Sequence, residues 1–193
     1  MREHWHKRGL DDAWIDYYKV GYCHERSFGK FLSPTLTIPI WHDGKCIGLS
    51  HRLLMEDPPG GKYRPHLPGA GKPLFYADVL MPALVNNVIL VEGEIKAMVT
   101  FSRMFQEDYQ WNVAAILGGW SEKYAPEFEH AANVYIVLDP DAFSQSVKAA
   151  RDIGAEKCRI IELPAKIDDL FNIGALDKKL LIQLIKQGRK VKR

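Results

Sequence analysis

Two stretches decide the fold, VILVEGEIKAM at residues 88–98 and VYIVLDPDAF at residues 134–143. Each begins as an apolar run typical of a strand buried on both faces of a parallel sheet. Each run then ends abruptly in acid, the first at Glu92 and the second at Asp139 and Asp141. Two buried strands that end on carboxylates indicate that these acids serve one purpose.

Strand-like and helix-like segments alternate along the second half of the chain. We predict strands over residues 88–91, 113–117, 134–138 and 159–163. Helices are predicted between them over 93–106, from Ser121 as a cap to 132, and up to 153, where Gly154 ends the helix. A last helix is expected over 177–186, before a basic tail. Apolar strands that alternate with helices are typical of a parallel sheet covered on both faces.

The first part of the chain has a different pattern. A partly helical spacing around Trp14 to Val20 is expected to end at Gly21. Two β-rich runs flank Asp43-Gly44, a pair that favours the tight turn of a hairpin. Residues 57–73, DPPGGKYRPHLPGAGKP, are dense in proline and glycine and are predicted to form a loop.

Together these patterns predict an α/β protein with a smaller α+β subdomain at its amino-terminal end. We assign residues 1–85 to that basic subdomain and residues 86–172 to the domain with βα alternation and a parallel sheet. Residues 173–193 form the C-terminal helix and basic tail. A chain of 193 residues, 47% of them hydrophobic, is long enough for one ordinary core and a smaller appendage.

Composition excludes several classes of protein. The 26 basic and 24 acidic residues nearly cancel, so bulk charge does not identify a partner. Cys23, Cys46 and Cys158 lie far apart and form neither a zinc motif nor a disulfide framework. No apolar run approaches the roughly 20 residues of a membrane span, and the first residues have no apolar signal region. We expect a soluble, cytoplasmic protein.

The acids that follow strands are candidate metal ligands. Four acids, Glu92, Asp139, Asp141 and Asp168, fall within a few residues after predicted strands, and the carboxyl ends of parallel strands meet at one edge. We expect these acids on one exposed patch there, where their hard oxygens select Mg²⁺ or Mn²⁺. Each acid alone is better explained as a helix cap. Their joint position favours the metal site.

These stretches, together with ELPAKIDDLF at residues 162–171, resemble the Toprim domain in order and spacing. More narrowly, they resemble the catalytic core of bacterial DnaG-type replicative primases and their phage relatives. Three amino-terminal segments are similar to that core as well: KRGLDDAWIDYYKVGY at 7–22, TIPIWHDGKCIGLSHRLL at 37–54 and GKYRPHLPGAGKPLFYAD at 61–78. The resemblance covers nearly all of residues 6–172.

The resemblance implies a function in DNA replication. It implies metal-dependent nucleotidyl transfer that makes short primers on single-stranded DNA from nucleoside triphosphates, with Mg²⁺ or Mn²⁺ as cofactor. A replicative helicase or a separate zinc-binding module is an implied partner, and a phage or mobile element is an implied setting. The implied residues are Glu92, Asp139 and Asp141 for catalysis, the same three with Asp168 for metal, and Arg8, Arg52 and Lys62 for nucleic acid or nucleotide.

Two positions depart from the family pattern. Primases usually have a second acid four residues after the Toprim glutamate, where this chain has Lys96. A basic residue commonly follows the second aspartate, where this chain has Ala142. The zinc-binding module that normally precedes the core is not recognised either, so we expect a minimal primase-like protein, an excised fragment or one subunit of a split enzyme.

Two other functions fit parts of the sequence. A Toprim metal-dependent nuclease shares the acids but lacks the amino-terminal motifs. A degenerate, non-catalytic primase-like module that binds nucleic acid is favoured by Lys96 and Ala142 and opposed by the intact Glu92, Asp139 and Asp141.

Overall fold

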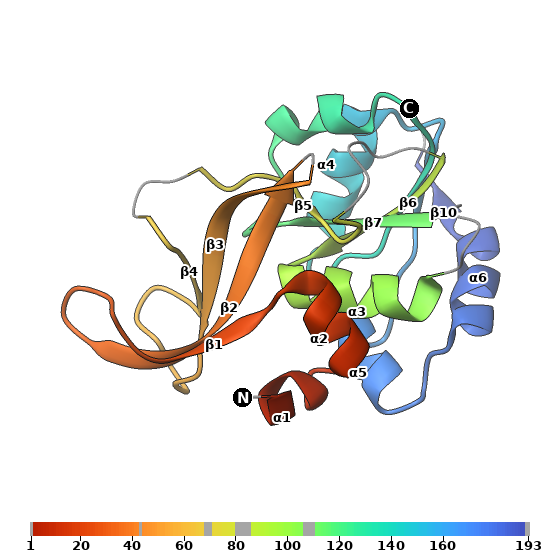
Figure 1. Ribbon diagram of the computed structural model, residues 1–193. Coiled ribbons are helices and arrows are strands. Elements are labelled where there is room, and N and C mark those ends of the chain that lie inside the picture. The colour runs from red at the N-terminus through yellow and green to blue at the C-terminus, as the bar shows by residue number, and fades with distance from the viewer. Residues whose placement is uncertain (1, 43, 68–70, 80–85, 106–110, 192–193) are drawn as a thin grey trace. The chain divides into compact units, whose positions relative to one another are not determined.

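The computed structural model describes residues 2–42, 44–67, 71–79, 86–105 and 111–191 (Figure 1). The chain divides into two compact units, Met1–Gly71 and Lys72–Arg193. The sequence placed the border near residue 85. Strand β5 (Phe75–Tyr76) pairs with β7 (Trp111–Ile116) in the sheet of the second unit, so that unit begins earlier along the chain.

The first unit combines two short helices with an antiparallel sheet. The helices are α1 (Arg2–His6) and α2 (Asp12–Tyr18). The strands are β1 (Gly21–Ser27), β2 (Leu32–His42), β3 (Lys45–Leu53) and β4 (Tyr63–Pro65), and they pair in that order. Its core includes Trp5, whose indole Nε1 donates to the carbonyl of Gly21 at 3.2 Å.

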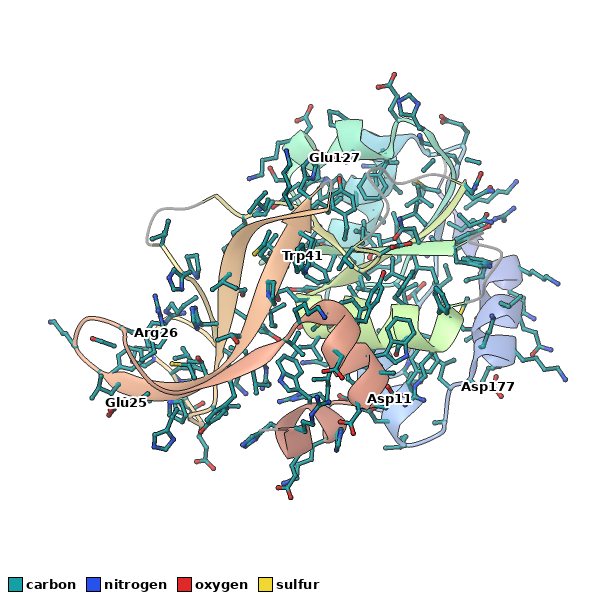
Figure 2. All side chains as sticks on the ribbon, in the orientation of Figure 1. Asp11, Glu25, Arg26, Trp41, Glu127 and Asp177 are labelled. Atoms are coloured by element: carbon teal, nitrogen blue, oxygen red, sulfur yellow. The ribbon has the colours of Figure 1, made fainter. Side chains whose placement is uncertain are left out.

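The ends of α2 explain where the predicted helix stops. Asp11, labelled in Figure 2, caps the start of α2 by accepting from the backbone N–H of Trp14. Lys19 ends it in the left-handed region, with φ of 54°. Gly21, the predicted stop, instead begins β1.

The predicted hairpin is present as the antiparallel pair β2 and β3. Gly44 has φ of 67°, which a residue without a Cβ adopts at little cost. Asp43, the other residue of the predicted turn, lies outside the described residues.

The stretch expected to be a loop contains a short strand. Residues Tyr63–Pro65 pair with β3 as β4. The guanidinium of Arg64 donates hydrogen bonds of 2.8 Å to the carbonyls of Gly60 and Gly61. Arg64 therefore fastens the Gly-rich turn before β4, a contact with no signal in the local sequence pattern.

The second unit is built on a mixed sheet with a parallel centre. Its other strands are β6 (Asn86–Glu92), β8 (Ala131–Ile136), β9 (Cys158–Ile160) and β10 (Arg189–Lys190). The order is β10-β9-β8-β6-β7-β5. The pairs among β9, β8, β6 and β7 are parallel, whereas β5 and β10 are antiparallel edge strands. The predicted fold class is confirmed.

Helices cover both faces of this sheet. Helix α3 (Glu94–Met104) packs on β6 and β7, and α5 (Ile167–Asn172) packs on α3. Helix α4 (Phe143–Ile153) packs on β8, β9 and the 3₁₀ helix η1 (Glu122–Phe128). Figure 1 shows α3 and α4 on opposite sides of the central strands. Val88, Leu90, Val134 and Ile136 belong to the apolar cluster beneath α4 and η1.

Some helix boundaries follow the sequence and others do not. Gly154 ends α4 with φ of 127°, as predicted. The prediction of a helix over 121–132 was wrong. The segment forms only the short 3₁₀ helix η1, which contains Pro126, and the Ser121 side chain makes no capping hydrogen bond. Helix α5 was not predicted.

The C-terminal part belongs to the second unit. Asp177, labelled in Figure 2, caps helix α6 (Lys178–Gln187) by accepting from the N–H of Leu180 at 2.7 Å. Arg189 and Lys190 of the basic tail then pair with β9 as β10. Among the described residues, no helix is long and apolar enough to span a membrane.

Replacing Leu90 with alanine tests the core of the second unit. Leu90 lies on the central strand β6 and is fully buried. We expect Leu90→Ala to lower the free energy of unfolding by about 2–5 kcal/mol, because it leaves a cavity. The change is measured by urea titration followed by circular dichroism. Ile173→Ala, at an exposed position, is the control and is expected to change it by less than about 0.5 kcal/mol. Equal losses in both variants would contradict this packing.

Candidate active site

The strand order reverses between β6 and β8. From β6 the chain passes through α3 to β7 on one side, and from β8 it passes through α4 to β9 on the other. The two strands are direct neighbours in parallel register, with Leu90 opposite Ile136. In open α/β sheets, ligands bind beyond the carboxyl ends of strands at such a reversal. Glu92 ends β6, and Asp139 follows β8 at this place.

Gly93 allows the chain to turn sharply after Glu92. It has φ of 88°, in the region that favours glycine, and its N–H donates to the carbonyl of Ile116 on β7 at 3.0 Å. Helix α3 starts at the next residue. The half-buried Glu92 side chain is therefore held at the junction of a strand and a helix.

A proline turn presents the second acidic pair. The N–H of Ala142 donates to the carbonyl of Asp139 at 2.8 Å and closes a four-residue turn with Pro140 at its second position. The Asp139 side chain is 13% exposed, whereas Asp141 is exposed. The turn thus separates the environments of two aspartates that stand two residues apart.

The turn also explains one departure from the family pattern. Ala142 is buried within the apolar cluster beneath α4. A long basic side chain at this position would not fit within that cluster, so the packing of this turn favours a small apolar residue.

Two ammonium groups meet the carboxylate of Asp139. Lys96 Nζ, from the first turn of α3, lies 2.7 Å from Oδ1 and donates a hydrogen bond of 2.9 Å to Oδ2. Both side chains are only 13% exposed. Lys166 Nζ, which is more exposed, lies 3.7 Å from Oδ2. Both oxygens of Asp139 are therefore already neutralised by the protein.

Glu92 shares this electrostatic environment. Burial raises the pKa of its carboxyl above the usual value, and the negative charges of Asp139 and Asp141 raise it further. Lys96 and Lys166 act in the opposite direction without cancelling the effect. A carboxylate with a raised pKa accepts a proton more readily than an ordinary one.

Asp168 borders the same group from the first turn of α5. It is 6% exposed, and its Oδ1 has no hydrogen-bond partner among the described residues. Burial raises its pKa, with a further contribution from Asp169, while the charge of Lys96 lowers it. Lys96 thus acts on acids from two separate segments of the chain.

The expectation of one exposed patch was wrong for Asp139 and Asp168, which are largely buried. Asp168 lies on α5, which packs on α3, and Asp139 is paired with Lys96 of α3. Among the described residues, no group of three or more acids, histidines or cysteines is arranged to hold a metal ion. Glu92 and the exposed Asp141 suit a hard cation by their oxygen chemistry, whereas Asp139 is paired with Lys96.

Solved structures share the fold of this chain. A primase from Aquifex aeolicus, comprising zinc-binding and RNA polymerase domains, matches 98% of the chain with a TM-score of 0.74 and 21% identity. The DnaG primase catalytic domain bound to single-stranded DNA matches 98% with a TM-score of 0.69 and 18% identity. The primase fragment of the bacteriophage T7 primase-helicase protein matches 92% with a TM-score of 0.65 and 15% identity.

The chain has the fold of a primase catalytic core. It spans 56% of the Aquifex chain, 74% of the DnaG domain and 72% of the T7 fragment. No protein-family model matches it, and no curated protein matches it in sequence. The resemblance noted in the sequence is thereby confirmed.

The basic residues expected to bind nucleic acid lie in the first unit of this primase-like core. Lys62 is exposed. Arg52 is 9% exposed, its guanidinium lies 5.9 Å from the centre of the Tyr63 ring, and its Nε has no hydrogen-bond partner among the described residues. Arg8 is half-buried. Of the three, Lys62 is the most accessible.

Sequence reasoning missed Lys166 as a member of the acidic site. It stands two residues before Asp168, so its place beside Asp139 arises from the packing of segments far apart in sequence.

Lys72 falls within residues 1–85, which the sequence analysis assigned to the amino-terminal subdomain. In the structure it belongs to the second unit, where its ammonium lies beside Gly118, after β7. A Cβ at position 118 would require that ammonium to shift.

The raised pKa of Glu92 predicts a pH-dependent cost to stability. Its ordinary value is 4.5, so the folded state holds the proton to a higher pH than the unfolded state. Stability from this group is present below 4.5 and is lost as pH rises through the folded value. We expect Glu92→Gln to be more stable than wild type at pH 7 in chelator, with the difference vanishing as pH falls below 4.5. Urea unfolding across this range measures it.

Asp141→Asn is the matched control, because Asp141 is exposed. It is expected to change stability less than Glu92→Gln does. A gain in Glu92→Gln that is the same at every pH would show that ionisation of Glu92 is not its cause.

Proposed function

We propose that this chain is the catalytic core of a DNA primase, which makes short primers on single-stranded DNA from nucleoside triphosphates. The observation that carries the proposal is the position of Glu92, Asp139 and Asp141 at the strand reversal of a primase fold. The chain's place in DNA replication follows from the same proposal, as does a replicative helicase or a zinc-binding module as partner.

The acidic residues have distinct roles in this proposal. In primer synthesis the 3′-hydroxyl oxygen of the primer bonds to the α-phosphorus of the incoming nucleotide, and the bond to pyrophosphate breaks. Glu92, whose pKa is raised in the metal-free protein, is placed to receive the hydroxyl proton. Asp141 would hold Mg²⁺ or Mn²⁺, and Asp139 and Asp168 extend the acidic centre. When bound, the divalent ion offsets negative charge on the phosphates.

The lysines complete the charge balance. Pyrophosphate leaves with several negative charges, and Lys166, exposed beside Asp139, is placed to attract them. On the first unit we assign Lys62, with Arg52 and Arg8, to the phosphates of the template or nucleotide. Phosphate contacts of this kind position a strand without reading its sequence.

A second candidate is a non-catalytic primase-like module that binds nucleic acid. The direct pairing of Lys96 with Asp139 favours it, because one acid of the centre is neutralised without metal. A Toprim nuclease is the third candidate, and it shares only the acids.

Primer synthesis on single-stranded DNA tests the three candidates. Purified chain, labelled nucleotides and Mg²⁺ or Mn²⁺ are expected to give short labelled products. Glu92→Gln and Asp141→Asn are each expected to lower the product by about 100-fold or more, because each removes charge placed for the transition state. Gel analysis of the products measures the loss.

Glu25→Gln, at an exposed position on β1 that is labelled in Figure 2, is the control and is expected to retain full activity. Cleavage of the DNA without synthesis would indicate the nuclease. Binding without either reaction would indicate the non-catalytic module.

Binding to single-stranded DNA is expected to depend steeply on salt, since phosphate contacts release counterions. Lys62→Ala should lower the slope of log affinity against log salt by about one unit. Fluorescence anisotropy over a salt series measures the slope. Lys179→Ala, at an exposed position on α6, removes the same charge elsewhere. If both variants change the slope equally, Lys62 makes no specific contact.

A further inference from the structure

The ion pair between Lys96 and Asp139 differs from the other lysine pairs in the second unit. Its ammonium reaches both carboxylate oxygens, and each partner is 13% exposed. By contrast, Lys148 and Asp152 form a helical pair four residues apart, in which Lys148 is 57% exposed. The first pair joins α3 to the turn after β8, and the second lies within α4.

Lys96 also stands at an unfavourable place in its own helix. It is the third residue of α3, where the partial positive charge of the helix amino terminus repels a cation and favours an acid. The helix gains nothing electrostatically from a lysine here. The stabilising partner is Asp139, to which its ammonium is bonded.

Lys96 is closer to Asp139 than Lys166 is, and it is the less exposed of the two lysines. Asp168 is 6% exposed, its Oδ1 has no hydrogen-bond partner in the described part of the chain, and the charge of Lys96 favours its ionised form. Lys166 is farther from Asp139 and lies mostly in solvent. The Lys96 ammonium is therefore the cation nearest to Asp139, in the turn after β8, and it also acts on Asp168 of α5.

We infer that Lys96 is a tethered competitor of the divalent cation. Its ammonium occupies the cation position at Asp139, and a metal ion reaches that carboxylate only by displacing it. The inference rests on the proposed function for the metal itself, since it concerns the same acidic centre. Its consequence is a centre that is charge-balanced without metal and binds divalent ions weakly.

Mn²⁺ affinity, measured from the electron paramagnetic resonance of the free ion, tests this without nucleotide or DNA. We expect Lys96→Met to bind Mn²⁺ roughly tenfold more tightly than wild type, because Asp139 loses its competing cation. Lys96→Arg keeps the cation and is expected to stay within about twofold of wild type. Asp139→Asn added to Lys96→Met is expected to remove the gain.

Lys148→Met is the matched control, since it removes the same charge from a surface pair. An equal gain in Lys148→Met would show a general effect of net charge and would overturn the inference, as would unchanged affinity in folded Lys96→Met. If Lys96→Met unfolds in chelator, Mn²⁺ should restore its circular dichroism at concentrations that leave wild type unchanged. If Mn²⁺ restores the circular dichroism of neither Lys96→Met nor Lys96→Asp, the inference is also overturned.

These outcomes are independent of primer synthesis. A chain that makes no primers but gains Mn²⁺ affinity in Lys96→Met retains the inference and loses the proposed polymerase activity. A chain that makes primers but shows no gain retains the activity and loses the inference.

Discussion

The parallel pairing of β6 with β8 is the constraint on which the candidate site depends. It brings the end of one strand, at Glu92, beside the turn that follows the other, at Asp139. The backbone bond from Val137 to Leu90 continues this pairing past the last residue of β8. A slip of one residue between the strands would exchange the side chains that pack on the two faces of the sheet and would separate the acids.

Charge balance is the second level of organisation. Acids at strand ends repel one another, and packing α3 and α5 over them raises the cost by excluding water. Lysine ammonium groups, chiefly that of Lys96, offset this cost by neutralising Asp139. The carboxylate therefore does not depend on a metal ion for its neutralisation. The result is a centre whose acids differ in exposure to solvent: Asp168 is buried, Glu92 is half-buried and Asp141 is exposed.

Periodicity and punctuation were enough to predict the central strands and α4 with its glycine stop, and they placed the acids of the candidate site after those strands. Those features depend on local pattern and on the general geometry of parallel sheets. The 3₁₀ helix around Pro126, the strand β4 and the helix α5 were not predicted, because each depends on packing or on contacts such as that of Arg64. The burial of Asp168 and the place of Lys166 depend on tertiary contacts that sequence spacing does not encode.

The two edge strands of the second sheet, β5 and β10, are each two residues long. The edge of a sheet presents unpaired backbone N–H and C=O groups, to which a strand of another chain can bind. A shorter edge strand presents fewer of these groups. Here the outermost strands of the sheet are these two brief antiparallel segments. The arrangement limits self-association through the sheet, so that crowding many copies at one site does not favour fibrous growth through these edges.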